Sequence, residues 1–180
     1  MSADASTWRQ VIEYDRLIQN PEVRDLLVRY AARKGWNPSA QTLLNLYDAS
    51  VGMVVGVKTA TIASIGVPIF TALGIKTGKS RSESLALPPG QVIVAALCSL
   101  AYRGQELQKV HQAQDGCVLE AKLPSDIWSW QGSLAIAITS NPPRTQVQAT
   151  TRIGGQLFDW GKSSRCLERV FQDISRFPEF

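Results

Sequence analysis

The chain has 180 residues, 44% of them hydrophobic, so one domain with a sizeable core is expected. Its net charge is only +4 and its 19 lysines and arginines form no dense basic run, so no nucleic-acid partner is predicted. Three cysteines without a CxxC pair and a single histidine favour neither a disulfide framework nor a zinc site. We therefore predict no metal and no other cofactor.

Residues 1–48 are expected to form a helical region. Its clearest start signal is Asn20-Pro21-Glu22, because asparagine caps a helix, proline suits the first position and glutamate complements the helix dipole. The apolar residues that follow at helical spacing are Val23, Leu26, Leu27 and Tyr30. The sequence therefore predicts an amphipathic helix that begins at residue 21, with shorter helices before it and after residue 39.

An apolar stretch over residues 51–75 contains one charged residue, Lys58. Small residues recur in it at every fourth position and would form a smooth stripe on a helix: Gly52, Gly56, Ala60 and Ser64. The first two have the GxxxG spacing that allows two helices to approach closely. We predict a central apolar helix within residues 49–76, with this stripe packed against another helix.

Two environments remain open for this helix. Its length reaches the roughly 20 residues that a bilayer span requires. Lys58 and the break at Gly66-Val67-Pro68 instead favour burial within the protein. The first residues lack the charged and apolar regions of a signal peptide, so a cytoplasmic protein is expected, with membrane association through residues 51–75 as the alternative.

Residues 76–83 read as a basic loop. Only three residues separate Gly74 from Gly78, whereas a phosphate-binding loop has four between its glycines, so no nucleotide site is predicted. Residues 82–87 form a weak strand pattern, and Pro88-Pro89-Gly90 then starts a helix. The residues on its expected buried face are Val92, Ile93, Ala96, Leu97 and Leu100.

Further strands follow in one run. Residues 105–114 read as a polar strand, and Asp115-Gly116 is a strong hairpin signal. The returning strand has an apolar face made of Cys117, Leu119, Ala121 and Leu123. Two more alternating segments lie at 134–139 and 146–153. The last helix, capped by Asp159 or Ser163, has as apolar residues Leu167, Val170, Phe171 and Ile174.

This order of elements predicts an α+β fold. The antiparallel meander sheet would have two helices on one face, preceded by the N-terminal helical region and the central apolar helix. We divide the chain into a helical region at 1–48, an apolar helix at 49–76, buried or in contact with a membrane, and a sheet domain at 82–180.

Two short motifs carry a resemblance. Residues 126–132 read DIWSWQG and residues 158–162 read FDWGK. Together they resemble small, uncharacterised bacterial α+β domains, which have a Ser-Trp-Gly-like turn and an Asp-Trp-Gly-Lys helix start. The resemblance covers residues 82–176, and Gln131 interrupts the first motif. It implies the α+β fold and no known activity.

Candidate catalytic residues are few. His111 lies on a polar strand without an acid or cysteine at ligand spacing, so an exposed surface histidine is expected. The three cysteines, Cys98, Cys117 and Cys166, lie among apolar neighbours, which raise a thiol pKa and make it unreactive. No catalytic residue is therefore predicted, and the chain is not expected to be an enzyme.

Aromatic residues are expected to gather at one end of the sheet. Four of them fall in loops at comparable ends of adjacent strands: Trp128, Trp130, Phe158 and Trp160. Lys162, at the start of the last helix, is predicted to belong to the same cluster. They would close the end of the core, or else line an apolar ligand site or an interface.

The predicted function is a non-enzymatic binding or assembly module that acts through protein–protein contacts. Its partner would be another protein or a second copy, contacted through the helix at 51–75. The alternatives are a membrane-associated protein anchored by residues 51–75, with a cytoplasmic α+β domain, and a domain that binds a small apolar ligand.

Overall fold

A computed structural model of the chain describes residues 7–33, 52–55, 70, 78–123, 132–153 and 161–178. Thr7, residues 52–55, Ile153 and Lys162 are described for their backbone alone. The elements, in chain order, are η1 (Thr7–Gln10), α1 (Tyr14–Gln19), α2 (Pro21–Ala32), β1 (Gly52–Val55), β2 (Lys79–Leu85), α5 (Pro89–Arg103), β3 (Leu107–Gln112), β4 (Gly116–Leu123), β5 (Gly132–Asn141), β6 (Arg144–Ile153) and α6 (Lys162–Arg176).

The described strands form one sheet in the order β1-β3-β4-β5-β6-β2. Strands β3 to β6 are neighbours in sequence and in space and run antiparallel, while β2 pairs antiparallel with β6. The predicted α+β class and antiparallel sheet are confirmed. Strand β1 was not predicted, and it pairs parallel with β3 at the opposite edge.

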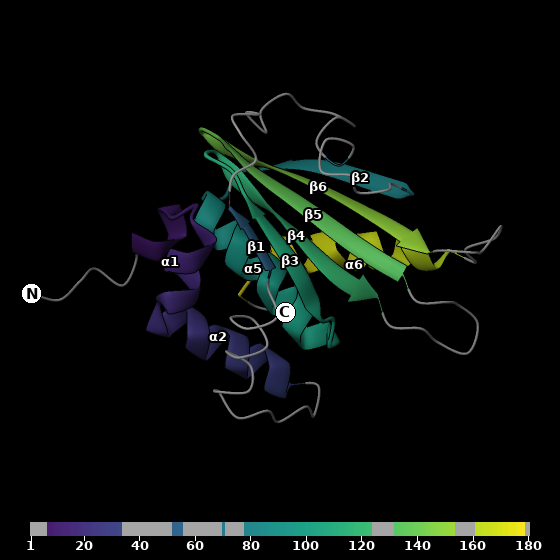
Figure 1. Cartoon of the computed structure of the whole chain (residues 1–180), viewed down its shortest axis with the longest axis horizontal. Helices are drawn as coiled ribbons and strands as arrows, with labels where there is room; N and C mark the ends of the chain where they lie inside the picture. The colour runs from purple at the N-terminus through teal and green to yellow at the C-terminus, as the bar shows by residue number, and fades with distance from the viewer. Residues whose placement is uncertain are drawn as a thin grey trace, which may run out of the picture.

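Helix α5 occupies the centre of the molecule. Figure 1 shows α5 and α6 behind the sheet, with α1 and α2 beside α5. Every residue from Val92 to Ala101 is buried, including those that face away from the sheet. The predicted buried face is therefore present, but the helix is covered all round because η1 and α2 pack against it.

Helix α2 begins where the sequence predicts it. The Asn20 side-chain oxygen accepts hydrogen bonds from the backbone N–H groups of Glu22, at 2.9 Å, and Val23, at 3.3 Å. These bonds satisfy two donors that lack partners within the helix. The predicted apolar face of this helix is buried: Val23, Leu26, Leu27 and Tyr30.

The N-terminal helices complete the core of the sheet domain. One hydrophobic cluster contains Trp8 and Leu17 from the N-terminal region, Leu97 from α5, Ile136 from β5 and Phe171 from α6. Helices α1 and α2 therefore bury their apolar faces against the sheet domain. The domain division predicted at residues 49–76 stays a prediction.

The central apolar stretch differs from the prediction where the structure describes it. Gly52–Val55 is a β-strand, so the predicted helix and its stripe are wrong at Gly52. A short apolar run is compatible with a buried strand as well as with a helix. Here the pairing with β3 makes the segment a strand. The other stripe residues, Gly56, Ala60 and Ser64, lie outside the described part. Phe70 is 1% exposed and contacts the face of the sheet opposite α5.

Two element boundaries also differ. Strand β2 begins at Lys79, within the segment read as a basic loop, because β6 offers a partner along the whole of β2. Helix α6 is preceded by Gly161 at φ 76° without a side-chain cap, and Ser163 lies inside the helix, so Ser163 is not the predicted cap. Asp159 lies outside the described residues.

Candidate functional site

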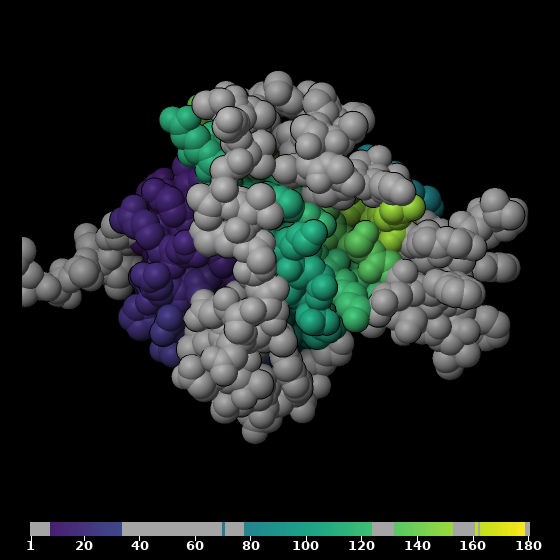
Figure 2. All heavy atoms as spheres, viewed as in Figure 1, coloured from purple at the N-terminus to yellow at the C-terminus, as the bar shows by residue number. Residues whose placement is uncertain are grey.

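The sheet has a second face, opposite α5 and α6, which is the face toward the viewer in Figures 1 and 2. Near its middle, Val118, Ala135 and Ala137 are buried together with Phe70. Figure 2 shows atoms of β3 to β6 at the surface on this side, as a band from teal to yellow-green. This outer face is therefore apolar in one part and accessible in another.

Three strand ends meet at one end of this face. Leu123, the last residue of β4, pairs with Gly132, the first of β5, and Gly132 pairs with Ile153, the last of β6. The segments 124–131 and 154–160, which carry the predicted aromatic residues, therefore start from neighbouring strand ends. The aromatic residues themselves lie outside the described residues: Trp128, Trp130, Phe158 and Trp160. The backbone of Lys162 begins α6.

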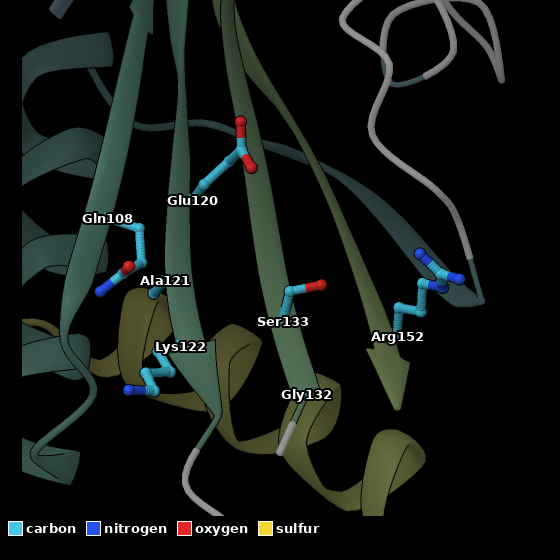
Figure 3. Close-up of a pocket in the computed structure, with 7 residues that line it drawn as sticks. All are labelled: Gln108, Glu120, Ala121, Lys122, Gly132, Ser133 and Arg152. Atoms are coloured by element: carbon cyan, nitrogen blue, oxygen red, sulfur yellow. The ribbon is translucent and has the colours of Figure 1, made fainter. Parts of the chain in front are cut away.

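A depression of about 520 Å³ lies at this end of the outer face. Most of its lining residues have polar side chains, and both signs of charge are present, as Figure 3 shows. The lining residues are Gln108, Glu120, Ala121, Lys122, Gly132, Ser133 and Arg152. Small-molecule sites are mostly enclosed and apolar. This depression instead has the polar character of the rim of a protein–protein interface.

Three of these residues form a row across three strands. Lys122 on β4 pairs with Ser133 on β5, and Ser133 pairs with Arg152 on β6. Directly paired residues lie on the same face of a sheet, so Ser133 lies between Lys122 and Arg152 on the outer face. Ser133 and Arg152 are exposed and Lys122 is partly exposed. We call this set the Lys–Ser–Arg row.

The row could not be read from the sequence. Each member lies at the end of a predicted strand or just beyond it, and the alternation of side chains assigns each to the polar face. Which residues stand side by side depends on the register between strands, which the turn lengths alone do not determine.

His111 does not lie where the sequence predicts it. The residue is 7% exposed, and its Nε2 contacts Oε1 of Glu120 on β4. The prediction of an exposed histidine is wrong because β1 pairs on the other side of β3 and places His111 inside the sheet. The buried Nδ1 atom has no hydrogen-bond partner among the described residues. Neither the partner nor the burial had a local signal in the sequence.

The buried cysteines behave as their apolar neighbours predict. Burial raises the pKa of the Cys98 thiol, with Arg29 and Arg33 opposing the effect, and raises the pKa of Cys117 from 9.0 to about 12. Cys166 is instead partly exposed, with its Sγ 3.9 Å from the Gln105 side-chain nitrogen, so the predicted shielding by apolar neighbours does not extend to this thiol. Cys98 and Cys117 are therefore protonated at neutral pH and shielded from reagents.

At pH 8 we expect the native protein to expose one reactive thiol, that of Cys166, to an aromatic disulfide reagent. All three cysteines should react after unfolding in urea, because their burial is then lost. Absorbance at the wavelength of the released thiolate measures the count, and Cys166→Ser should abolish the fast phase. A fast phase of two or three thiols in the native state would contradict the burial of Cys98 and Cys117.

In the portions of the chain with described structure, no group of three potential metal ligands is present, and no helix is long and apolar enough to cross a membrane. Comparisons of the chain with protein-family models, with curated proteins and with solved structures find no significant match.

Proposed function

We propose that this protein is a non-enzymatic binding module that contacts a protein partner through the end of its sheet. The observation that carries the proposal is the polar depression on the outer face, where Lys122, Ser133 and Arg152 are accessible. Protein interfaces combine such polar rims with apolar contacts, and the predicted aromatic residues would come from the two segments that begin at the neighbouring strand ends.

The helix layer on the inner side of the sheet is consistent with a scaffold role for this part of the protein. Helix α5 is buried on all sides and its Cys98 thiol is held protonated, so the helix layer contributes stability rather than reactive groups. The partner would be another protein or a second copy of the chain. Residues 51–75 remain the alternative contact, although Gly52–Val55 and Phe70 are engaged with the sheet.

Membrane anchoring through residues 51–75 is the second candidate function. The burial of Phe70 against Val118, Ala135 and Ala137 favours the first candidate, because a residue that covers the sheet does not face lipid. Binding of a small apolar ligand is the third candidate function, and it depends on the predicted aromatic residues.

Site-specific photocrosslinking tests the proposal. A photoreactive phenylalanine analogue at Ser133, an exposed residue of the depression, should give a discrete adduct with a partner protein or a second copy. The same analogue at Gln172, exposed on α6, is the control and should give none. Mass spectrometry identifies the adduct. Equal labelling from the two positions, or no adduct from Ser133 in cell extract and at high protein concentration, would refute the proposed interface.

A further inference from the structure

We infer that the Lys–Ser–Arg row is an oxyanion-binding site, which takes a carboxylate or phosphate group. The inference rests on the proposed function, since it names the group that a partner would place in the depression. Arginine and lysine beside a hydroxyl supply the donors that such groups require, and the guanidinium fork can bind two oxygens at once.

The spacing of the row suits one oxyanion. Adjacent strands lie about 4.8 Å apart, so the Cα atoms of Lys122 and Arg152 are separated by about 10 Å with Ser133 midway. Long side chains reach diagonal neighbours across strands, so both cations can approach a group that sits above the Ser133 hydroxyl. In Figure 3 the Lys122 and Arg152 side chains extend to opposite sides of Ser133. An oxyanion above Ser133 would attract both cations, and these long side chains can turn toward it.

Among the described residues, the cations of the row have only weak partners. The Lys122 ammonium lies 3.9 Å from a Glu106 carboxylate oxygen, and both side chains are more than 40% exposed, so this pair contributes little. The side chains of Arg152 and Ser133 form no ion pair or hydrogen bond with another described residue. An incoming oxyanion therefore displaces few bonds to the described residues.

Two acids among the described residues lie close to the row: Glu106, which contacts Lys122, and Glu120. Glu120 precedes Lys122 by two residues on the same face of β4, and its carboxylate contacts His111 Nε2. The side chain is 22% exposed. Glu120 lines the depression, but its carboxylate already contacts His111, and Figure 3 shows it apart from the Lys122 and Arg152 head groups.

Titration of the ¹⁵N-labelled full chain with inorganic phosphate, at constant ionic strength, tests the inference. The largest amide shifts should be saturable and lie at Ser133 and its paired neighbours. Lys122→Gln and Arg152→Gln should each raise the apparent Kd at least fivefold. Arg169→Gln removes the same charge from the exposed face of α6 and should leave the Kd unchanged. Non-saturable shifts, or equal effects of all three substitutions, would show general charge screening and overturn the inference.

A second titration, with a tetraglutamate peptide, separates the two sources of the oxyanion. Tighter binding of the peptide assigns the site to acidic side chains of a protein, and tighter binding of phosphate assigns it to a phosphoryl group; both results support an oxyanion site. Failure of both ligands at the row overturns it. The Ser133 photocrosslink is independent of these ligands, so a partner captured there without anion binding would leave the proposed function standing and remove only this inference.

Discussion

Gly90→Ala is expected to lower the free energy of unfolding by about 3 kcal/mol, because no space exists for the added methyl group. A Cβ atom at this position would lie 2.6 Å from the Val11 carbonyl oxygen and 2.7 Å from that of Arg9, and closer still to that of Trp8. All three obstacles are backbone atoms, which cannot rotate away as a side chain can. The substitution must therefore push η1 away from the first turn of α5.

Urea denaturation followed by tryptophan fluorescence measures this effect. Gly104→Ala is the matched control: Gly104 ends α5 at φ 62°, and alanine there costs about 1 kcal/mol from backbone strain alone. Gly90→Ala should also reduce the burial of Trp8, which is 3% exposed and donates a hydrogen bond to Glu22 at 2.8 Å. Equal costs for the two alanine variants would show that η1 does not press on Gly90.

The helices were the part of the fold that the sequence could predict. The signals that begin α2 and α5 are local: Asn20 with Pro21 in one case, and Pro88-Pro89-Gly90 in the other. The Asp115-Gly116 hairpin is local as well, and the structure places it between β3 and β4, with the Ala113 N–H bonded to the Gly116 carbonyl at 2.8 Å. Each of these elements is specified by residues close to it in sequence.

The contacts that join distant segments could not be predicted from the sequence. Strand β1 exists because Gly52–Val55 meets β3, more than fifty residues later, and no turn signal connects the two. The burial of His111 follows from that pairing, so the error on His111 and the error on the central stretch have one cause. The Lys–Ser–Arg row has the same character, because its members meet only through the registers of β4, β5 and β6.

Asp173→Asn is expected to cost about 3 kcal/mol, because it breaks a largely buried ion pair between α5 and α6. Asp173 is 6% exposed, and its carboxylate accepts two hydrogen bonds of 2.9 Å from the Arg103 guanidinium. The buried Ser99 hydroxyl donates a third, of 2.6 Å. An amide of the same shape keeps one acceptor oxygen but leaves the guanidinium, whose side chain is 23% exposed, without its counter-charge.

A double-substitution cycle distinguishes the ion pair from simple packing. Arg103→Met should also destabilise the fold, since it leaves the Asp173 carboxylate buried with Ser99 alone. The double variant Arg103→Met with Asp173→Leu replaces the pair by apolar groups and should recover most of the loss, because the desolvation penalty of both charges then disappears. Ser99→Ala, which removes one neutral donor, should cost about 1 kcal/mol. Additive losses in the double variant, measured by urea denaturation, would mean that the two side chains stabilise the α5–α6 contact by packing and not by their charges.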